Sequence, residues 1–214
     1  VRQYYEQGTH VVLVDTGNSY QGLCEMINKK TKGEDGIYFT YTEEKPISFN
    51  PFYTDDLVFD VEKKDSIKTL LLTLWKSEED KISKTESGEL GSAVTAYIDR
   101  IKADRSIVPN FNTFYEFMRD TYRTELEERA IKVSKDDFNI DNFLTTLRQY
   151  YSGGRFDFLL NSDKNIDLLS KRFIVFEIDA IKENKELFPV VTIIIMEAFI
   201  NKMRRLKGIR KQLI

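Results

Sequence analysis

Residues 10–15 read His10-Val11-Val12-Leu13-Val14-Asp15, and they are the strongest single indication of the fold class. Its apolar residues are continuous rather than alternating, which indicates a strand covered on both faces, as in a parallel sheet flanked by helices. The turn that follows it, residues 16–18, leads to Ser19, which we expect to cap a short helix. The stretch therefore predicts an α/β arrangement in which a buried strand feeds directly into a helix.

Further strands are predicted at both ends of the chain. Residues 37–41 form a short apolar run, residues 172–179 are apolar in the middle and acidic at the exit, and residues 212–214 begin a last strand. A long helix is predicted from Phe188 to Gly208, with Pro189 in its first turn, where the missing N–H donor costs nothing. These segments predict a mainly parallel sheet built from the two ends of the sequence.

The apolar period changes from 2 to 3.6 at about residue 62, which predicts a helical block. Apolar faces recur at helical spacing as far as Tyr151, before Gly153-Gly154. We expect a mobile loop within residues 76–91, which contain Gly88 and Gly91, and a helix whose reciprocal cap is formed by Thr113 and Glu116. The predicted organisation is a core of residues 1–61 and 161–214 carrying an all-helical insertion of residues 62–160.

Composition narrows the classes of function. The formal net charge is -3, with a single cysteine (Cys24) and a single histidine (His10), which excludes an intrachain disulfide and a zinc site built on several histidines. No signal peptide is visible, and the longest apolar stretch, residues 187–200, is too short for a membrane span, which needs roughly 20 apolar residues. We also interpret both ends as cuts through a longer protein, since a helix end and a strand start would have nothing to bury against.

Five segments together carry a resemblance to a known family. They are residues 10–15 with Ser19-Tyr20, residues 47–52, residues 153–161, residues 172–179 and residues 188–214. In these segments the chain resembles the TraG-type conjugative-transfer ATPases, which power type IV secretion of DNA and pilus components. Between residues 60 and 150 only helical patterning supports the resemblance. It implies a RecA-like P-loop ATPase core with a helical insertion, in agreement with the organisation predicted from periodicity.

The resemblance also implies where the nucleotide chemistry lies. In the family, the phosphate loop comes just before the helix that ends here at Gly8, and an acidic metal-binding motif follows the strand that begins at Gln212. The sequence contains no Gly-x-x-x-x-Gly-Lys, so we expect ATP and Mg²⁺ to act in the intact protein, with no cofactor or metal in this piece. We expect this piece to be inactive by itself.

Three residues remain as weak site candidates. Asp15 ends a predicted parallel strand, where α/β folds place ligands, although we favour the simpler role of initiating the turn. Arg155 follows a flexible Gly-Gly and is a candidate arginine finger, with an ordinary surface charge as the favoured alternative. Glu177 is a candidate for orienting water or metal, but we favour solvated strand-end acids for Glu177 and Asp179.

Two further groups have simpler explanations. The cations Lys202, Arg204, Arg205, Lys207, Arg210 and Lys211 form a basic cluster that could contact DNA phosphates, although its place at a helix C-terminus already accounts for half of it. Around Asn50-Pro51-Phe52 we expect the proline to fix the backbone and the two phenylalanines, Phe49 and Phe52, to fill the core. Cys24 lies on an apolar helix face, and we expect it to be buried and unreactive.

Two hypotheses of function follow. In the first, this region belongs to an energy-coupling ATPase, whose implied partners are other subunits of a ring and secretion-channel proteins. The resemblance places such a protein in the cytoplasm, peripheral to the inner face of the bacterial inner membrane. In the second, the α/β core is a degenerate scaffold and the helices form a non-enzymatic interaction module.

Overall fold

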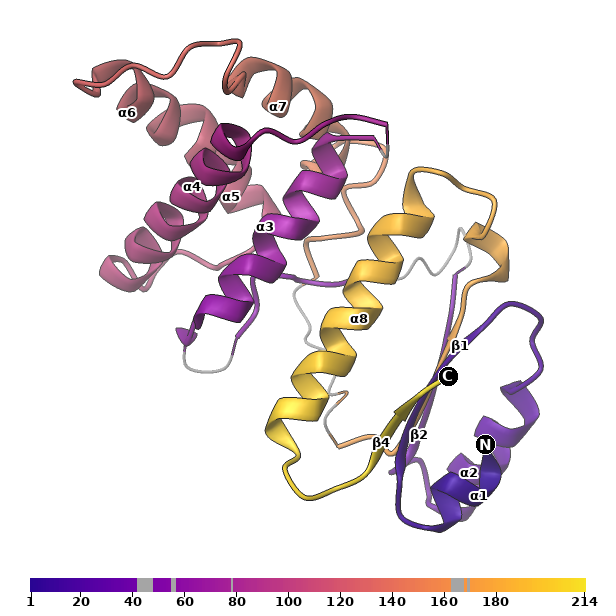
Figure 1. The fold of residues 1–214 in the computed structure, drawn as a ribbon. Coiled ribbons are helices and arrows are strands. Elements are labelled where there is room, and N and C mark those ends of the chain that lie inside the picture. The colour runs from indigo at the N-terminus through magenta and orange to yellow at the C-terminus, as the bar shows by residue number, and fades with distance from the viewer. Residues whose placement is uncertain (42–47, 55–56, 78, 163–167, 169) are drawn as a thin grey trace. The chain divides into compact units, whose positions relative to one another are not determined.

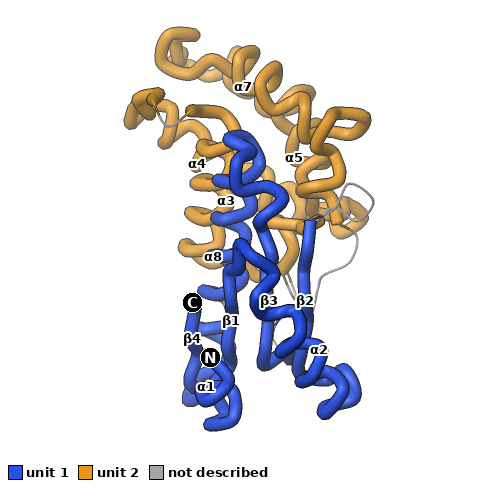
Figure 2. Tube along the Cα trace, turned by 90° about the vertical axis from the view of Figure 1, so that its right-hand side faces the viewer, with its two compact units in different colours: residues 1–47, 166–214 blue, residues 48–165 orange. Residues whose placement is uncertain are grey.

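The computed structural model describes residues 1–41, 48–54, 57–77, 79–162, 168 and 170–214. They form two compact units, one of Val1–Ile47 with Ile166–Ile214 and one of Ser48–Asn165 (Figure 2). The predicted segment at 47–52 begins outside the described residues, since Ile47 is not among them. No described helix is both long and apolar enough to cross a membrane.

The first unit is built on a parallel sheet of four described strands. The strand order is β2-β3-β1-β4, and every described pairing is parallel, which confirms the predicted fold class. The strands are β1 (His10–Asp15), β2 (Gly36–Thr40), β3 (Phe173–Glu177) and β4 (Lys211–Leu213). All five residues of β3 are buried, as expected for a strand paired on both sides and covered on both faces.

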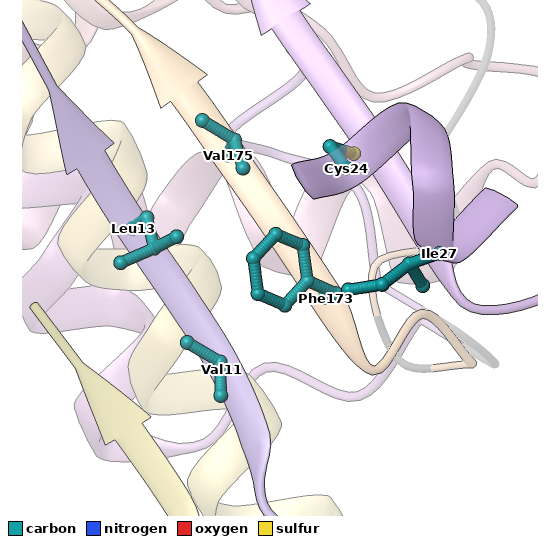
Figure 3. Close-up of a cluster of buried hydrophobic side chains, with 6 residues drawn as sticks. All are labelled: Val11, Leu13, Cys24, Ile27, Phe173 and Val175. Atoms are coloured by element: carbon teal, nitrogen blue, oxygen red, sulfur yellow. The ribbon is translucent and has the colours of Figure 1, made fainter. Parts of the chain in front are cut away.

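Different helices cover the two faces of this sheet, α1 (Arg2–Glu6) and α2 (Gln21–Lys30) on one face and α8 (Leu187–Arg205) on the other (Figure 1). A short 3-10 helix, η4 (Asp179–Ile181), follows β3. On the α2 face, Cys24 and Ile27 pack with side chains of β1 and β3, among them Phe173 and Val175 (Figure 3). Alternate residues of a strand point to opposite faces, so Val12, Ile174 and Phe176 lie on the α8 face, and all three are at most 2% exposed.

The regular structure described in the second unit is all helical, as the change of period predicts. Its elements are α3 (Val61–Trp75), α4 (Lys84–Ala103), α5 (Phe111–Phe117), a π-helical turn η2 (Met118–Tyr122), α6 (Arg123–Glu128), α7 (Ile140–Leu147) and the 3-10 helix η3 (Arg148–Tyr150). Aromatic rings fill its core: Phe52, Tyr97 and Phe114 contact one another with centroids 5.3–5.5 Å apart. Of the two phenylalanines predicted to fill the core, Phe52 is 0% exposed, which confirms its role, whereas Phe49 is only partly buried.

Four helix boundaries correct the sequence predictions, two of them in the helical unit. The mobile loop expected within 76–91 is wrong from Lys84 onward, because a capping box of Ser83 and Glu86 starts α4 there and places Gly88 and Gly91 inside the helix. The cap expected at Thr113 is wrong too: Asn110 caps α5, and Thr113 is the reciprocal partner. An asparagine side chain is as good a cap as a hydroxyl, and here it lies three residues earlier.

The other two corrections concern the first unit. Ser19 does not cap α2, whose N-cap residue is Tyr20 and makes no side-chain cap bond. The long helix ends at Arg205 rather than at Gly208, and Gly208 instead takes a left-handed turn with φ of 80° before β4.

Candidate functional site

The carboxyl edge of the sheet brings Asp15 and Glu177 together. The two residues are directly paired in the register of β1 and β3, at the last position of each strand. The chain leaves β1 for α2 on one face of the sheet and leaves β3 for α8 on the other (Figure 1). In open α/β sheets, ligands bind in the crevice at such a reversal, outside the carboxyl ends of the strands. Asp15 and Glu177 therefore stand where this fold offers a binding site.

Glu177 is buried, so the solvated strand-end acid that we favoured is wrong for this residue. Its side chain is 3% exposed, and its two oxygens accept hydrogen bonds from the backbone N–H of Asn18 at 2.8 Å and of Asp179 at 2.9 Å. Two charge-assisted bonds compensate for the burial of a carboxylate, which is costly when unpaired. Glu177 thus ties the turn after β1 to the turn after its own strand.

Asp179 does match the solvated interpretation. Its side chain is 43% exposed and pairs with Lys182 at 2.8 Å. Only one of the two acids at the end of β3 is therefore built into the edge of the sheet.

Asp15 makes the turn bond that we favoured for it. Its carboxylate accepts from the backbone N–H of Tyr20 at 3.1 Å, and the residue is 7% exposed. This bond satisfies a backbone donor at the start of α2, which explains why Ser19 is not needed as a cap. Glu177 and Asp15 together hold the loop formed by residues 16–20 at its middle, Asn18, and at its last residue, Tyr20.

Two residues that the sequence prediction missed complete this cluster. Asn18 has φ of 53°, a left-handed conformation that asparagine tolerates, and its side-chain oxygen accepts from the Tyr38 hydroxyl at 2.9 Å. Desolvation, with Glu177 and Asp15 nearby, raises the pKa of Tyr38 to about 12, so the hydroxyl remains a donor. The Thr16-Gly17-Asn18-Ser19 turn could have indicated Asn18, but nothing in the sequence pairs Tyr38 with it.

The residues present do not themselves make a nucleotide-phosphate or metal site. Both carboxylates are used by backbone donors, and within the described residues no group of three or more His, Cys, Asp or Glu side chains could hold a metal ion. The sequence also lacks the lysine-bearing phosphate loop. The cluster is suited to shaping the loop at residues 16–20 rather than to bond cleavage.

Arg155 lies in the helical unit, away in sequence from this edge. Its guanidinium stands over the Phe156 ring, with the central carbon 4.7 Å from the ring centroid, and the residue is exposed. The preceding Gly154 has no room for a side chain, because a Cβ there would lie 2.4 Å from the Gln149 carbonyl oxygen. The turn that presents Arg155 is therefore fixed by its sequence.

One residue of the predicted basic cluster, Lys202, is buried and cannot contact DNA. Lys202 is 1% exposed and donates from Nζ to the Leu168 carbonyl at 2.5 Å and the Lys171 carbonyl at 2.6 Å, so its assignment to DNA contact is wrong. Arg204, Arg205, Lys207 and Arg210 are exposed and Lys211 is partly exposed. Lys202 points into the core because its position on α8 falls on the buried face.

Two buried titratable groups lie elsewhere in the first unit. Burial raises the pKa of the Cys24 thiol to about 11, which agrees with the unreactive core cysteine predicted. Burial, followed by the nearby Lys202 and Arg172 charges, lowers the pKa of His10 to about 4. His10 is 7% exposed, and its Nδ1 has no hydrogen-bond partner among the described residues.

Comparisons with known proteins gave matches that cover nearly the whole chain. A search of curated proteins gave no match. Among solved structures, the chain is similar to VirB4 of Thermoanaerobacter pseudethanolicus, with a TM-score of 0.64 and 15% identity over 99% of this chain. This chain spans 54% of that VirB4 chain, and the likeness shows a shared fold. The model of the TraG P-loop domain matches residues 1–214. The chain therefore belongs to the TraG P-loop domain family.

Proposed function

We propose that this chain is part of an ATPase that couples ATP hydrolysis to transfer of DNA or assembly of a type IV secretion apparatus. The observation that supports this most is the cluster of Asp15, Asn18 and Glu177 at the carboxyl edge of the sheet, in a chain of the TraG P-loop family. This edge is where α/β folds bind ligands.

In this proposal the chain supplies positioning and the intact protein supplies the phosphate chemistry. ATP and Mg²⁺ are held by a phosphate loop and an acidic motif, neither of which the 214 residues contain. Glu177 and Asp15 hold the loop at 16–20 against the nucleotide pocket. Residues 1–214 alone are then inactive, because an anion cradle needs consecutive backbone donors and a lysine.

The proposed partners are other subunits of an ATPase ring and secretion-channel proteins, with the protein peripheral at the cytoplasmic side of the inner membrane. Arg155 is the candidate to reach a neighbouring subunit's nucleotide. The candidates for DNA phosphate contact are the exposed Arg204, Arg205, Lys207 and Arg210, together with the partly exposed Lys211. Binding through them would weaken steeply with salt.

The alternative is a non-enzymatic interaction module. It draws support from the compactness of the helical unit, which has its own aromatic core. In that case the sheet is a scaffold, and the edge cluster has no nucleotide to face.

ATP turnover by the intact protein separates the two. The proposal expects Mg²⁺-dependent phosphate release by the intact protein, reduced at least tenfold in Glu177→Gln and little changed in Asp179→Asn. If the folded wild-type protein hydrolyses none of several nucleoside triphosphates, the result supports the interaction module instead.

A further inference from the structure

The side chain of Asn18 carries a hydrogen-bond donor that the fold orients. Its Oδ1 accepts from the Tyr38 hydroxyl at 2.9 Å. The residue is exposed, and its Nδ2, which carries two N–H donors, makes no hydrogen bond to any residue that the structure describes. Asn18 follows the last residue of β1 by three positions, at the carboxyl edge where open α/β sheets bind ligands. An oriented amide donor therefore lies at the edge to which the proposed function assigns the nucleotide.

The backbone of Asn18 is fixed independently of its side chain. Its N–H donates to Glu177 Oε2 at 2.8 Å, and its φ of 53° lies in the left-handed region. Glycine adopts this region freely, and asparagine is one of the few other residues that tolerate it. Because glycine would satisfy the backbone equally well, the feature that asparagine adds at this position is its amide group.

Tyr38 holds this amide from the neighbouring strand β2. Its ring packs against the buried cluster formed by side chains of β1, β3 and α2, so its hydroxyl has a defined position. The bond to Asn18 joins the loop after β1 to the strand on the far side of β3. The Asn18 side chain is thus ordered before a ligand arrives, and an ordered donor loses less conformational entropy on binding than a free one.

The chemistry of the amide suits an oxygen acceptor. An amide N–H is a neutral donor, so it binds an acceptor oxygen without requiring an opposite charge. The carboxylates of Asp15 and Glu177 beside it already accept from backbone N–H groups. A nucleotide offers two kinds of acceptor oxygen, one on its phosphate groups and one on its ribose hydroxyls.

We propose that Asn18 is a nucleotide-binding residue that donates from Nδ2 to an oxygen of the bound nucleotide, and that Tyr38 is the positioning residue that orients its amide. This role rests on the proposed ATPase function, because it requires a nucleotide at the carboxyl edge. It is one contact in a site whose phosphate loop the 214 residues do not contain.

Calorimetric titration of the intact protein with a non-hydrolysable ATP analogue and Mg²⁺ tests the contact. Asn18→Gly keeps the left-handed backbone and the bond to Glu177 but removes the amide, so the affinity is expected to fall about three- to tenfold, the effect of one neutral hydrogen bond. Lys32→Gly is the matched control, because Lys32 is also exposed and left-handed, with φ of 52°, but precedes β2 at the opposite edge of the sheet. The control is expected to bind the analogue like the wild type.

A double-mutant cycle tests the role of Tyr38. Tyr38→Phe removes only the hydroxyl and is expected to weaken binding of the analogue about twofold or more, because the amide of Asn18 is then free to rotate. In the Asn18→Gly background the same change is expected to have no further effect, since no amide remains to be oriented. A merely structural role would weaken binding by the same factor in both backgrounds, and this result would overturn the positioning role. Tyr4→Phe, at an exposed tyrosine of α1, controls for the loss of a hydroxyl.

Asn18→Asp identifies which oxygen is contacted. A carboxylate repels a phosphate group, so for a phosphate oxygen the affinity is expected to fall further than in Asn18→Gly. A ribose hydroxyl can donate to the new carboxylate, so for that acceptor an affinity close to the wild type is expected.

The outcomes separate the contact from the proposed function. Wild-type affinity in a folded Asn18→Gly overturns the contact and leaves the proposed function standing. A folded wild type that does not bind the analogue overturns the proposed function and the contact together. Should Asn18→Gly fail to fold, Tyr38→Phe carries the test, since it leaves the loop backbone untouched, and unchanged affinity in that variant overturns the proposal.

Discussion

At the scale of single residues, burial distinguishes the charged side chains that hold the first unit together from those that lie on its surface. Glu177 and Lys202 both carry ionisable groups and are both nearly inaccessible, and each is hydrogen-bonded to the backbone. Their neighbours Asp179 and Arg204 have similar charges but face water. A sequence cannot distinguish the members of such pairs, because the difference depends on which way the strand end or helix face points.

Glu177 gives the first prediction. Replacing Glu177 with glutamine puts an amide NH₂ against one of the two backbone donors, so we expect the free energy of unfolding to fall by about 1–3 kcal/mol. The matched change Asp179→Asn removes only an exposed ion pair and is expected to cost less than about 1 kcal/mol. Urea unfolding of both variants measures this, and equal losses would show that the Glu177 bonds contribute no more than a surface pair.

His10 gives a prediction of pH dependence. Its pKa is lowered to about 4 in the folded protein from a usual 6.5, so the fold favours the neutral imidazole. The stability it contributes is fully present above pH 6.5 and is lost as the pH falls toward and through 4. The loss by pH 4 should be roughly 2–3 kcal/mol.

The control for His10 is His10→Gln, which does not titrate. Comparing unfolding free energies of wild type and variant between pH 7 and pH 4 cancels the carboxylates, which titrate in both. A gap between the two that stays constant over this range would contradict the buried, neutral histidine.

At the scale of elements, type and order of the strands and helices follow from sequence pattern, whereas their boundaries depend on side-chain bonds. The continuous apolar run of β1 predicted a buried parallel strand correctly, and the 3.6 period predicted the helices. The start of α4 was missed because its two glycines suggested a loop, while the cap of Ser83 and Glu86 outweighs them. The edge cluster could be predicted only in part, since Asp15 and Glu177 end strands but Tyr38 joins them through folding.

Two glycines offer an opposed pair of tests at this scale. Gly88 lies inside α4 with open space where a Cβ would be, so Gly88→Ala should stabilise the protein by about 0.5–1 kcal/mol. Gly154→Ala should destabilise it, because the new Cβ would meet the Gln149 carbonyl at 2.4 Å. Thermal unfolding of both variants measures this, and a destabilising Gly88→Ala would place that residue outside a helix.

At the scale of the whole molecule, the segments where the chain enters and leaves the helical unit are hydrogen-bonded to each other through their backbones. The Phe49 N–H donates to the Leu159 carbonyl at 2.9 Å, and the Ser162 N–H donates to the Phe49 carbonyl at 3.1 Å. These bonds join the first and last segments of the unit. The aromatic side chains of its core contact other residues of the same unit. Compactness of this kind is typical of a part that folds independently.

Residues 48–165 expressed alone are therefore expected to fold. Far-ultraviolet circular dichroism should show a helical spectrum with a cooperative thermal transition. Phe52→Ala, which removes a fully buried ring, should lower the free energy of unfolding by about 3–5 kcal/mol. A spectrum without helical bands would show that the unit needs the sheet to fold.

The central claim is that the carboxyl edge of β1 and β3 faces the nucleotide in the intact protein. The most direct measurement is a structure of that protein with a non-hydrolysable ATP analogue and Mg²⁺. We predict that the nucleotide lies at this edge, with the loop of residues 16–20 beside it and Glu177 still bonded to the Asn18 N–H. A nucleotide bound at any other place on the sheet, or within the helical unit, would contradict the account.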